Sequence, residues 1–240
     1  MQKTSSGSPI LDELLNGGFE KEVITTLYGP AGSGKSNIAM IATASVVKQG
    51  KNVIYIDTEG GFSAERMKQL LPYDYERIMK NIILLKPTSF DEQKKHFAKL
   101  NGAVDKDKIG LIVVDSITML YRLEKGSDEE IRVTNKELAK QLSQLSEIAR
   151  KKDIPILVTN QVYADFNKEG NFHMVGGDLL KYWSKDIVKL EFENQYRRAA
   201  IVKHRSLPEG KNMTFEISNA GIYPVKLKKK LKLKKKFSLF

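Results

Sequence analysis

The octet Gly29-Pro30-Ala31-Gly32-Ser33-Gly34-Lys35-Ser36 combines glycines, a lysine and a hydroxyl group at fixed spacing. Glycines let backbone amide groups wrap around phosphates without side-chain clashes, and a helix that starts here adds positive potential. Lys35 then reaches the β- and γ-phosphates, and the Ser36 hydroxyl can bind Mg²⁺. A strand-like run before the octet and a helical pattern after it favour this interpretation over a plain glycine-rich turn. The octet, with Asn37 directly after it, predicts an ATP site.

A carboxylate at the end of an apolar run is a candidate partner for this metal. Asp115 follows the apolar residues Leu111-Ile112-Val113-Val114. An aspartate at the end of a buried strand can hold Mg²⁺ through its water shell. Many such aspartates only cap the next helix, so the pattern is weak alone. Together with the octet it predicts a metal site formed by Ser36 and Asp115.

Two more polar residues follow strand-like runs and are candidates for catalysis beside Lys35. Glu59 closes the run from Val53, and a carboxylate there can act as the base that orients the attacking water. The alternative for Glu59 is a solvent-facing loop residue. Gln161 follows a run that begins at Ile156, and its uncharged amide can hydrogen-bond the γ-phosphate.

The elements that must position these residues alternate between strand-like and helical patterns. Near-continuous apolar strands suit a parallel sheet that is buried on both faces, so we expect an α/β fold. After residue 184, successive strands with short turns predict an antiparallel extension of the same sheet. The expected strands are Glu22–Tyr28, Asn52–Asp57, Asn81–Leu85, Leu111–Val114, Ile156–Thr159, Lys185–Glu193, Ala199–His204 and Met213–Ile217, and the expected helices are Ser36–Lys48, Phe62–Leu71 and Asn135–Lys151.

The formal charge of +11 is concentrated at one end of the chain. Eight lysines lie between Lys226 and Lys236 without an acidic residue, which leaves +3 for residues 1–225. We therefore expect one domain over 1–225 and a basic, low-complexity tail over 226–240 that is disordered or adds phosphate contacts. The chain has no apolar run of membrane-spanning length and no signal-peptide pattern at its start, so the expected location is the cytoplasm. It has no cysteine, which excludes disulfides and thiolate metal sites but does not identify a compartment.

Several segments together closely resemble the archaeal RadA and eukaryotic recombinases, the RecA/RadA family. The resemblance covers about residues 5 to 224 and implies a RecA-like P-loop ATPase core. It is carried, in the family's order, by Leu11 to Gly18, Ile56 to Arg66, Asp115-Ser116, Leu120-Tyr121-Arg122, Thr159-Asn160-Gln161-Val162, Gly176-Gly177 and Leu207-Pro208-Glu209.

The resemblance implies a role for several of these residues. Glu59 corresponds to the catalytic glutamate, Gln161 to the residue that senses the γ-phosphate, and Arg66 to an arginine that stacks on the adenine. A surface helix arginine is the alternative for Arg66. The segments after Tyr121-Arg122 and from Val162 to Gly177 correspond to the two DNA-binding loops of the family.

The chain also departs from this family. It begins directly with the ATPase core, where recombinases carry a helical DNA-binding domain, and it contains no Phe-x-x-Ala segment for subunit assembly. Its second loop is short, and its first, Leu123 to Glu130, is acidic. In these departures the chain resembles a short archaeal paralogue of RadA that supports recombination without driving strand exchange.

Three potential cations in a row, Lys203-His204-Arg205, remain outside these motifs. They can contact a DNA backbone, contact ATP bound to a neighbouring subunit, or form a basic strand edge that discourages aggregation. We keep all three interpretations and take DNA binding as the prediction.

The leading hypothesis is an accessory protein of homologous recombination and DNA repair that binds ATP, Mg²⁺ and single-stranded or branched DNA. It would hydrolyse ATP very weakly and would form at most a homodimer, not a stable filament. The resemblance implies RadA, a Holliday-junction resolvase or a replicative DNA polymerase as partners. The alternatives are an active strand-exchange recombinase and a KaiC-like regulatory ATPase that does not bind DNA, and a hexameric helicase is more distant.

Overall fold

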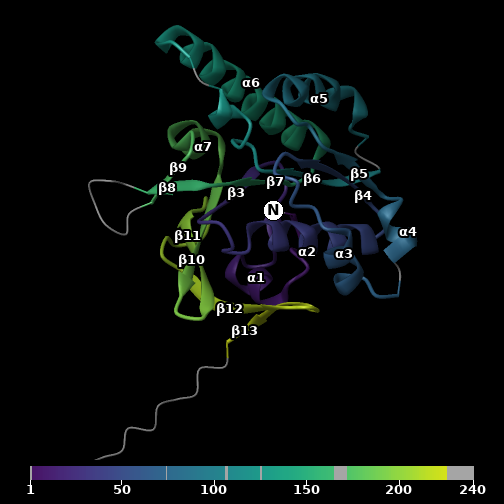
Figure 1. The fold of residues 1–240 in the computed structure, drawn as a ribbon. Helices are drawn as coiled ribbons and strands as arrows, with labels where there is room; N and C mark the ends of the chain where they lie inside the picture. Colours follow the sequence, from purple (N-terminus) through teal and green to yellow (C-terminus); the bar gives the residue numbers. More distant parts are fainter. Residues whose placement is uncertain (1, 74, 106–107, 125, 165–171, 226–240) are drawn as a thin grey trace, which may run out of the picture.

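The computed structural model describes residues 2–73, 75–105, 108–124, 126–164 and 172–225, and a nine-stranded sheet forms its centre (Figure 1). In the order in which they lie side by side, its strands are β13 (Gly221–Pro224), β12 (Asn212–Ser218), β11 (Tyr196–Lys203), β10 (Asp186–Glu193), β3 (Ile24–Tyr28), β7 (Ile156–Asn160), β6 (Ile109–Asp115), β4 (Asn52–Asp57) and β5 (Ile82–Leu85).

The sheet has a parallel part and an antiparallel part. From β10 to β5 every neighbouring pair is parallel, and β10, β11, β12 and β13 pair antiparallel. This confirms the expected antiparallel extension, with β13 as an additional strand. The carboxyl ends of β3, β4, β6 and β7 meet at one edge of the sheet, where ligands bind in open α/β sheets.

Helices cover both faces of the sheet. In Figure 1, α5 (Phe90–Ala103), α6 (Asp128–Lys152) and α7 (Gly177–Trp183) lie above it, and α1 (Pro9–Leu14), α2 (Lys35–Lys48) and α3 (Ala64–Leu70) lie below it; α4 (Tyr75–Met79) follows α3. Alternate residues of each central strand belong to two hydrophobic clusters, one on each face of the sheet. Val53 and Tyr55 pack on the α2 side, and Ile54 and Ile56 pack on the α6 side. Both faces of the strands are therefore apolar, as the sequence predicts.

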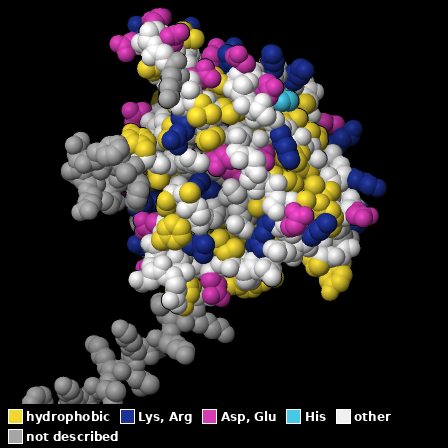
Figure 2. Space-filling view, in the orientation of Figure 1, with side chains coloured by type: hydrophobic (Ala, Val, Ile, Leu, Met, Phe, Trp, Pro, Cys, Tyr) yellow, Lys and Arg dark blue, Asp and Glu magenta, His cyan; other side chains and the backbone are white. Residues whose placement is uncertain are grey.

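Helix α6 begins seven residues earlier than the apolar spacing predicts. It starts at Asp128, not Asn135, because Ser127 and Glu130 form a capping box. Acidic residues in its first turn also favour the helix dipole. Part of the acidic segment expected to be a loop is therefore a helix, which follows a 3-10 turn, η1 (Tyr121–Leu123). The first turns of α6 project from the body, and acidic side chains gather at their tip (Figures 1 and 2).

Two small ribbons complete the fold. β1 (Lys3–Thr4) pairs with β2 (Phe19–Glu20), and β8 (Val162–Ala164) pairs with β9 (Phe172–Met174), both antiparallel. The second ribbon forms the base of the segment predicted as the second DNA loop; residues 165–171 lie outside the described part. Among the described residues, no helix has the length and apolar character to cross a membrane. The basic tail also lies outside the described residues.

Candidate nucleotide site

The glycine-rich octet lies between the end of β3 and the start of α2. A side chain at Gly29 would place its Cβ 2.1 Å from the carbonyl oxygen of Leu190 in β10, so only glycine fits this approach. Gly34 caps α2 with φ of +107°, a left-handed conformation that favours glycine. The first residues of α2 therefore direct their amide groups toward the loop, as the phosphate interpretation requires.

Lys35 is the buried cation of this loop. It is 7% exposed, and its Nζ donates hydrogen bonds to the carbonyl oxygens of Gly29 at 2.9 Å and Pro30 at 3.0 Å. Burial lowers the pKa of Lys35, and the negative charges of Glu59 and Asp115 act in the opposite direction. The ammonium group is therefore held inside the loop, close to both predicted carboxylates.

Asp115 lies at the end of β6 and is 1% exposed. It accepts hydrogen bonds from Tyr55 Oη at 2.8 Å, from Thr159 Oγ1 and from the Ser36 hydroxyl. Burial raises the pKa of Asp115, and these hydrogen bonds oppose that rise. Tyr55 and Thr159 were not anticipated from the sequence, because each reaches Asp115 from a different strand.

The pair Ser36 and Asp115 fits a magnesium ion that arrives with a nucleotide. A Cβ at Gly61 would lie 3.5 Å from Ser36 Oγ and 3.9 Å from Asp115 Oδ2, so this glycine leaves room beside both oxygens. Across the described ranges, no group of three or more His, Cys, Asp or Glu side chains could hold a metal ion alone. Mg²⁺ commonly binds one or two carboxylates together with substrate phosphates and waters, and the Ser36 hydroxyl with the Asp115 carboxylate fits this coordination.

Glu59 lies in an exposed turn after β4 that a buried aspartate holds in shape. Asp57 is 2% exposed and accepts hydrogen bonds from the backbone amides of Glu59 at 3.3 Å, Gly61 at 3.0 Å and Phe62 at 3.0 Å. Thr58 donates to the carbonyl oxygen of Ser116 at 2.7 Å and joins the turn to the end of β6. The sequence singles out Glu59 but misses Asp57, although an aspartate three residues before a Gly-Gly pair is a recognisable turn signal.

Gln161 lies where β7 passes into the β8–β9 ribbon. Its Oε1 accepts a hydrogen bond from Arg122 Nη1 at 3.0 Å, so it links the two predicted loop segments. The preceding Asn160 accepts a hydrogen bond from Thr118, and its Nδ2 donates to the carbonyl oxygen of Val175 at 2.9 Å. The ribbon is therefore fixed at both of its ends to the carboxyl edge of the sheet.

Arg66 connects α3 to the turn between β12 and β13. Its Nη1 donates to Gln69 Oε1 and to the carbonyl oxygen of Asn219, both at 2.9 Å. Its Nε and Nη2 are buried and have no hydrogen-bond partner in the described part of the chain. Burial lowers the pKa of Arg66. Asn37 is half-buried in the first turn of α2, directly after the octet.

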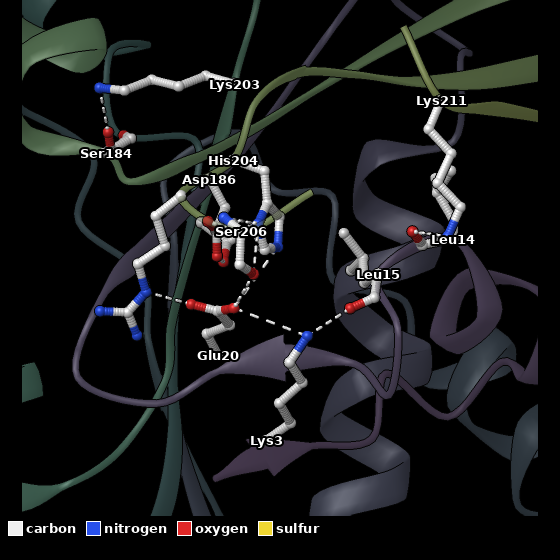
Figure 3. Close-up of polar contacts among 12 residues, drawn as sticks. Lys3, Leu14, Leu15, Glu20, Ser184, Asp186, Lys203, His204, Ser206 and Lys211 are labelled. Carbon is white, nitrogen blue, oxygen red and sulfur yellow. Dashed lines mark hydrogen bonds and ion pairs between the residues drawn. The ribbon is translucent and has the colours of Figure 1, made fainter. Parts of the chain in front are cut away.

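Lys203, His204 and Arg205 lie at the amino end of the parallel strands, away from the octet, and contact the protein itself. Figure 3 shows the surroundings of Lys203 and His204. Lys203 Nζ donates to the carbonyl oxygens of Lys181 at 2.6 Å and Ser184 at 2.8 Å. The His204 side chain is 1% exposed, and Arg205 Nε donates to the buried carboxylate of Glu20. The geometry therefore gives each of the three a role in the fold, and Arg205, with 28% of its side chain exposed, keeps the most access to a ligand.

A family model described as Rad51 matches residues 1–225 of this chain. The chain belongs to the Rad51 family. Among its relatives in the family is "DNA repair and recombination protein RadB" of Methanobrevibacter smithii, 42% identical over 225 residues that cover 91% of this chain and 94% of that protein. The RadB protein of Methanococcus maripaludis strain C5 is 44% identical over 214 residues, which cover 89% of this chain and 96% of that protein.

A solved structure of the same family supports the fold. The structure titled "Crystal structure of the RadB recombinase" has a TM-score of 0.78 and 38% sequence identity, and it covers 92% of this chain and 99% of that chain. The resemblance to archaeal RadB proteins within the RecA/RadA recombinases is therefore confirmed, as is the RecA-like fold with its mostly parallel sheet. DNA repair and recombination is the functional class of these relatives.

In this Rad51-family chain, a buried cluster of ionisable groups surrounds Glu20 (Figure 3). Burial acts to raise the pKa of Glu20, but the hydrogen bond and charge of Arg205, with His204 and Ser206, outweigh it and hold the pKa below its usual value. His204 Nε2 lies 3.7 Å from Asp186 Oδ1. Burial lowers the pKa of His204, and burial followed by the charge of Glu20 raises the pKa of Asp186 from 3.8 to about 6.

Replacing Asp186 with asparagine should therefore stabilise the protein at pH 8. The folded-state pKa is above the unfolded value, so the stability that protonated Asp186 contributes is present below pH 3.8 and is lost as the pH rises through about 6. Asparagine carries no charge at pH 8, so the variant avoids this loss of stability. The free energy of unfolding should rise by at most about 3 kcal/mol, at about 1.4 kcal/mol per pKa unit. Urea unfolding at pH 8 and at pH 4 measures it. The gain should shrink toward pH 4, and a gain that is equal at both pH values would contradict the assignment. The control is Glu209→Gln, at an exposed position between β11 and β12.

Proposed function

We propose that this protein is an ATP- and DNA-binding accessory factor of homologous recombination and DNA repair that works in the cytoplasm, with very weak ATP hydrolysis and no strand exchange of its own. One observation carries the proposal: Lys35, Ser36, Asp115, Glu59 and Gln161 lie at the carboxyl edge of one parallel sheet, in a chain similar to RadB proteins. ATP and Mg²⁺ are the proposed ligands.

The proposed division of labour follows the contacts of each residue. Lys35 would exchange its two carbonyl partners for phosphate oxygens, and Ser36 and Asp115 would hold Mg²⁺, which neutralises phosphate charge. Glu59, on the turn held by Asp57, would orient the water that attacks the γ-phosphate. Arg66, with two buried and unpartnered guanidinium nitrogens, would contact the adenine. Asn37 would contact the nucleotide from α2.

ATP would act mainly as a conformational switch. Gln161 is hydrogen-bonded to Arg122 and lies at the base of the β8–β9 ribbon. A γ-phosphate would accept a hydrogen bond from Gln161 Nε2, whereas Arg122 donates to Gln161 Oε1, so turning the amide toward the phosphate would displace the Arg122 contact and bias the ribbon. The switch therefore rests on the orientation of one amide group.

DNA binding is proposed at the segment of Lys203, His204 and Arg205, with Arg205 as the most accessible of the three, and, as an auxiliary contact, at the lysine-rich tail. On the face drawn in Figure 2, Lys and Arg side chains lie among acidic ones and form no broad basic patch. The acidic tip of α6 disfavours the first loop as a phosphate surface. RadA, a Holliday-junction resolvase or a replicative polymerase remain the proposed protein partners, and a homodimer the proposed assembly.

ATP turnover should be far below the ~1–100 s⁻¹ of efficient phosphoryl-transfer enzymes, and single-stranded DNA should stimulate it little. Glu59→Gln should lower the residual rate by about 10²–10⁴-fold and leave ATP binding unchanged, because Glu59 would act on the water and not on the nucleotide. Steady-state ATP hydrolysis, measured with and without single-stranded DNA, tests the rate, and a strand-exchange assay tests for recombinase activity. Strong DNA stimulation with strand exchange would support the recombinase alternative. ATP binding without any DNA binding would support the KaiC-like alternative.

A further inference from the structure

A hollow of about 310 Å³ opens beside the amino end of β3, at the opposite end of this strand from the glycine-rich octet. Its aromatic lining comes from the last turn of α7, and its floor includes Val23 and Ile24. The backbone amide of Lys185 donates to the carbonyl oxygen of Ile24 at 3.1 Å, which fixes the segment after α7 to the sheet. The hollow is therefore built on two rigid elements.

The most exposed part of the hollow is an aromatic ring held by a second one. Tyr182 is 72% exposed, and its ring lies edge-to-face with that of Trp183, with the centroids 5.3 Å apart and the planes at 86°. Trp183 is partly buried and packs against the core cluster on the α6 side of the sheet. Trp183 thus orients Tyr182 and leaves a face of the tyrosine open to a flat ligand.

Three cations and one acidic residue border these rings. Arg150, near the end of α6, and Lys185 are exposed, and neither has an ion-pair partner within the described ranges. Arg205 also borders the hollow and is held in place by Glu20. Glu22 is the acidic residue. The local charge balance is positive, in a chain whose first 225 residues have a formal charge of only +3.

We infer that this hollow binds single-stranded nucleic acid, with one base stacked on Tyr182 and the neighbouring phosphates bound by Arg150 and Lys185. The combination of an open aromatic face with a positively charged groove is the chemistry by which proteins bind unpaired strands. A duplex keeps its bases stacked inside, so it can use the cations but not the ring. The inference rests on the proposed DNA-binding function and extends it to residues that no motif of the chain indicates.

The full-length protein carries its own local probe. Trp183 is the single tryptophan of the chain and lines the hollow. Titration with a short oligothymidylate should quench its fluorescence to saturation, and a duplex of the same length should quench it less. Tyr182→Ala should weaken oligothymidylate binding about tenfold, within the range that one stacked base contributes, and Tyr182→Phe should bind as the wild type does. Arg150→Ala and Lys185→Ala should each flatten the slope of log K against log salt by about 0.7.

Matched controls come from a second hollow that has the same residue types. Tyr73, 97% exposed, and Lys80 border a hollow beside α3 and α4, and Tyr73→Ala and Lys80→Ala should leave the titration unchanged. Wild-type binding that Tyr182→Ala leaves intact would overturn this inference alone, since DNA would then bind elsewhere. Quenching by an acidic peptide but not by oligothymidylate would also overturn it. A wild type that binds no DNA in a separate filter-binding assay would overturn both the inference and the proposed DNA function.

Discussion

Replacing Lys35 with alanine should lower the affinity for ATP by about a hundredfold or more. Lys35 would give two charge-assisted hydrogen bonds to the β- and γ-phosphates, each contributing about 1.5–3 kcal/mol. No other lysine or arginine among the described residues donates to the carbonyl oxygens of the octet's first two residues. Calorimetric titration with ATP and Mg²⁺ measures the loss.

The control for this variant lies on the same helix. Lys48 is exposed in the last turn of α2, so Lys48→Ala should bind ATP as the wild type does. Circular dichroism establishes that both variants are folded. A folded Lys35→Ala protein with unchanged affinity would refute the assignment of the octet as a phosphate-binding loop.

Glu20→Ala should lower the free energy of unfolding by about 3–5 kcal/mol, the usual cost of removing one partner from a buried ion pair. Glu20 is 1% exposed and accepts hydrogen bonds from Arg205 Nε and from Ser206 Oγ at 3.2 Å, and Lys3 Nζ lies 3.6 Å from its Oε1. Without this carboxylate, the partly buried cations of Lys3 and Arg205 lose their counter-charge. Urea unfolding at neutral pH measures the change.

A second variant separates the charge pair from general packing. Glu13→Ala, at an exposed position of α1, should change stability by no more than about 0.5 kcal/mol. Combining Glu20→Ala with Arg205→Ala should cost less than the sum of the two single changes, because the second removes a cation that the first left unpaired. Strict additivity would mean that Glu20 stabilises the fold independently of Arg205.

Most of the sheet could be predicted from the sequence because its signals are local. The octet, the apolar run before Asp115 and the β-branched run of β4 each specify their element within a few residues, and β4 has the bounds that its pattern predicts. The start of α6 was missed because apolar spacing marks only the packed part of a helix. The projecting part is indicated instead by Ser127 and Glu130, which form a helix-capping box and do not belong to the apolar face of the helix.

The surroundings of the site residues could not be predicted, because they depend on contacts between distant segments. Tyr55 and Thr159 reach Asp115 from 60 and 44 residues away in the chain. Three neighbouring cations at 203–205 look like a surface patch in the sequence. Only the fold reveals that Lys203 donates hydrogen bonds to backbone carbonyl oxygens at the end of α7 and that Arg205 donates to a buried glutamate.

The separation of Glu20 from its partners has a consequence for the order of events during synthesis. Arg205 and Ser206 follow Glu20 by 185 and 186 residues, and Lys211, which donates to the carbonyl oxygen of Glu13, follows that residue by 198. At about 5–20 residues per second, the ribosome makes Arg205 roughly 10–40 s after Glu20. Throughout that interval Lys3 is the only cationic partner of Glu20, among the described residues, that has been synthesised. The amino-terminal segment can therefore form its own β1–β2 ribbon early, but it gains its contacts with Arg205, Ser206 and Lys211 only after the segment between β11 and β12 has been made.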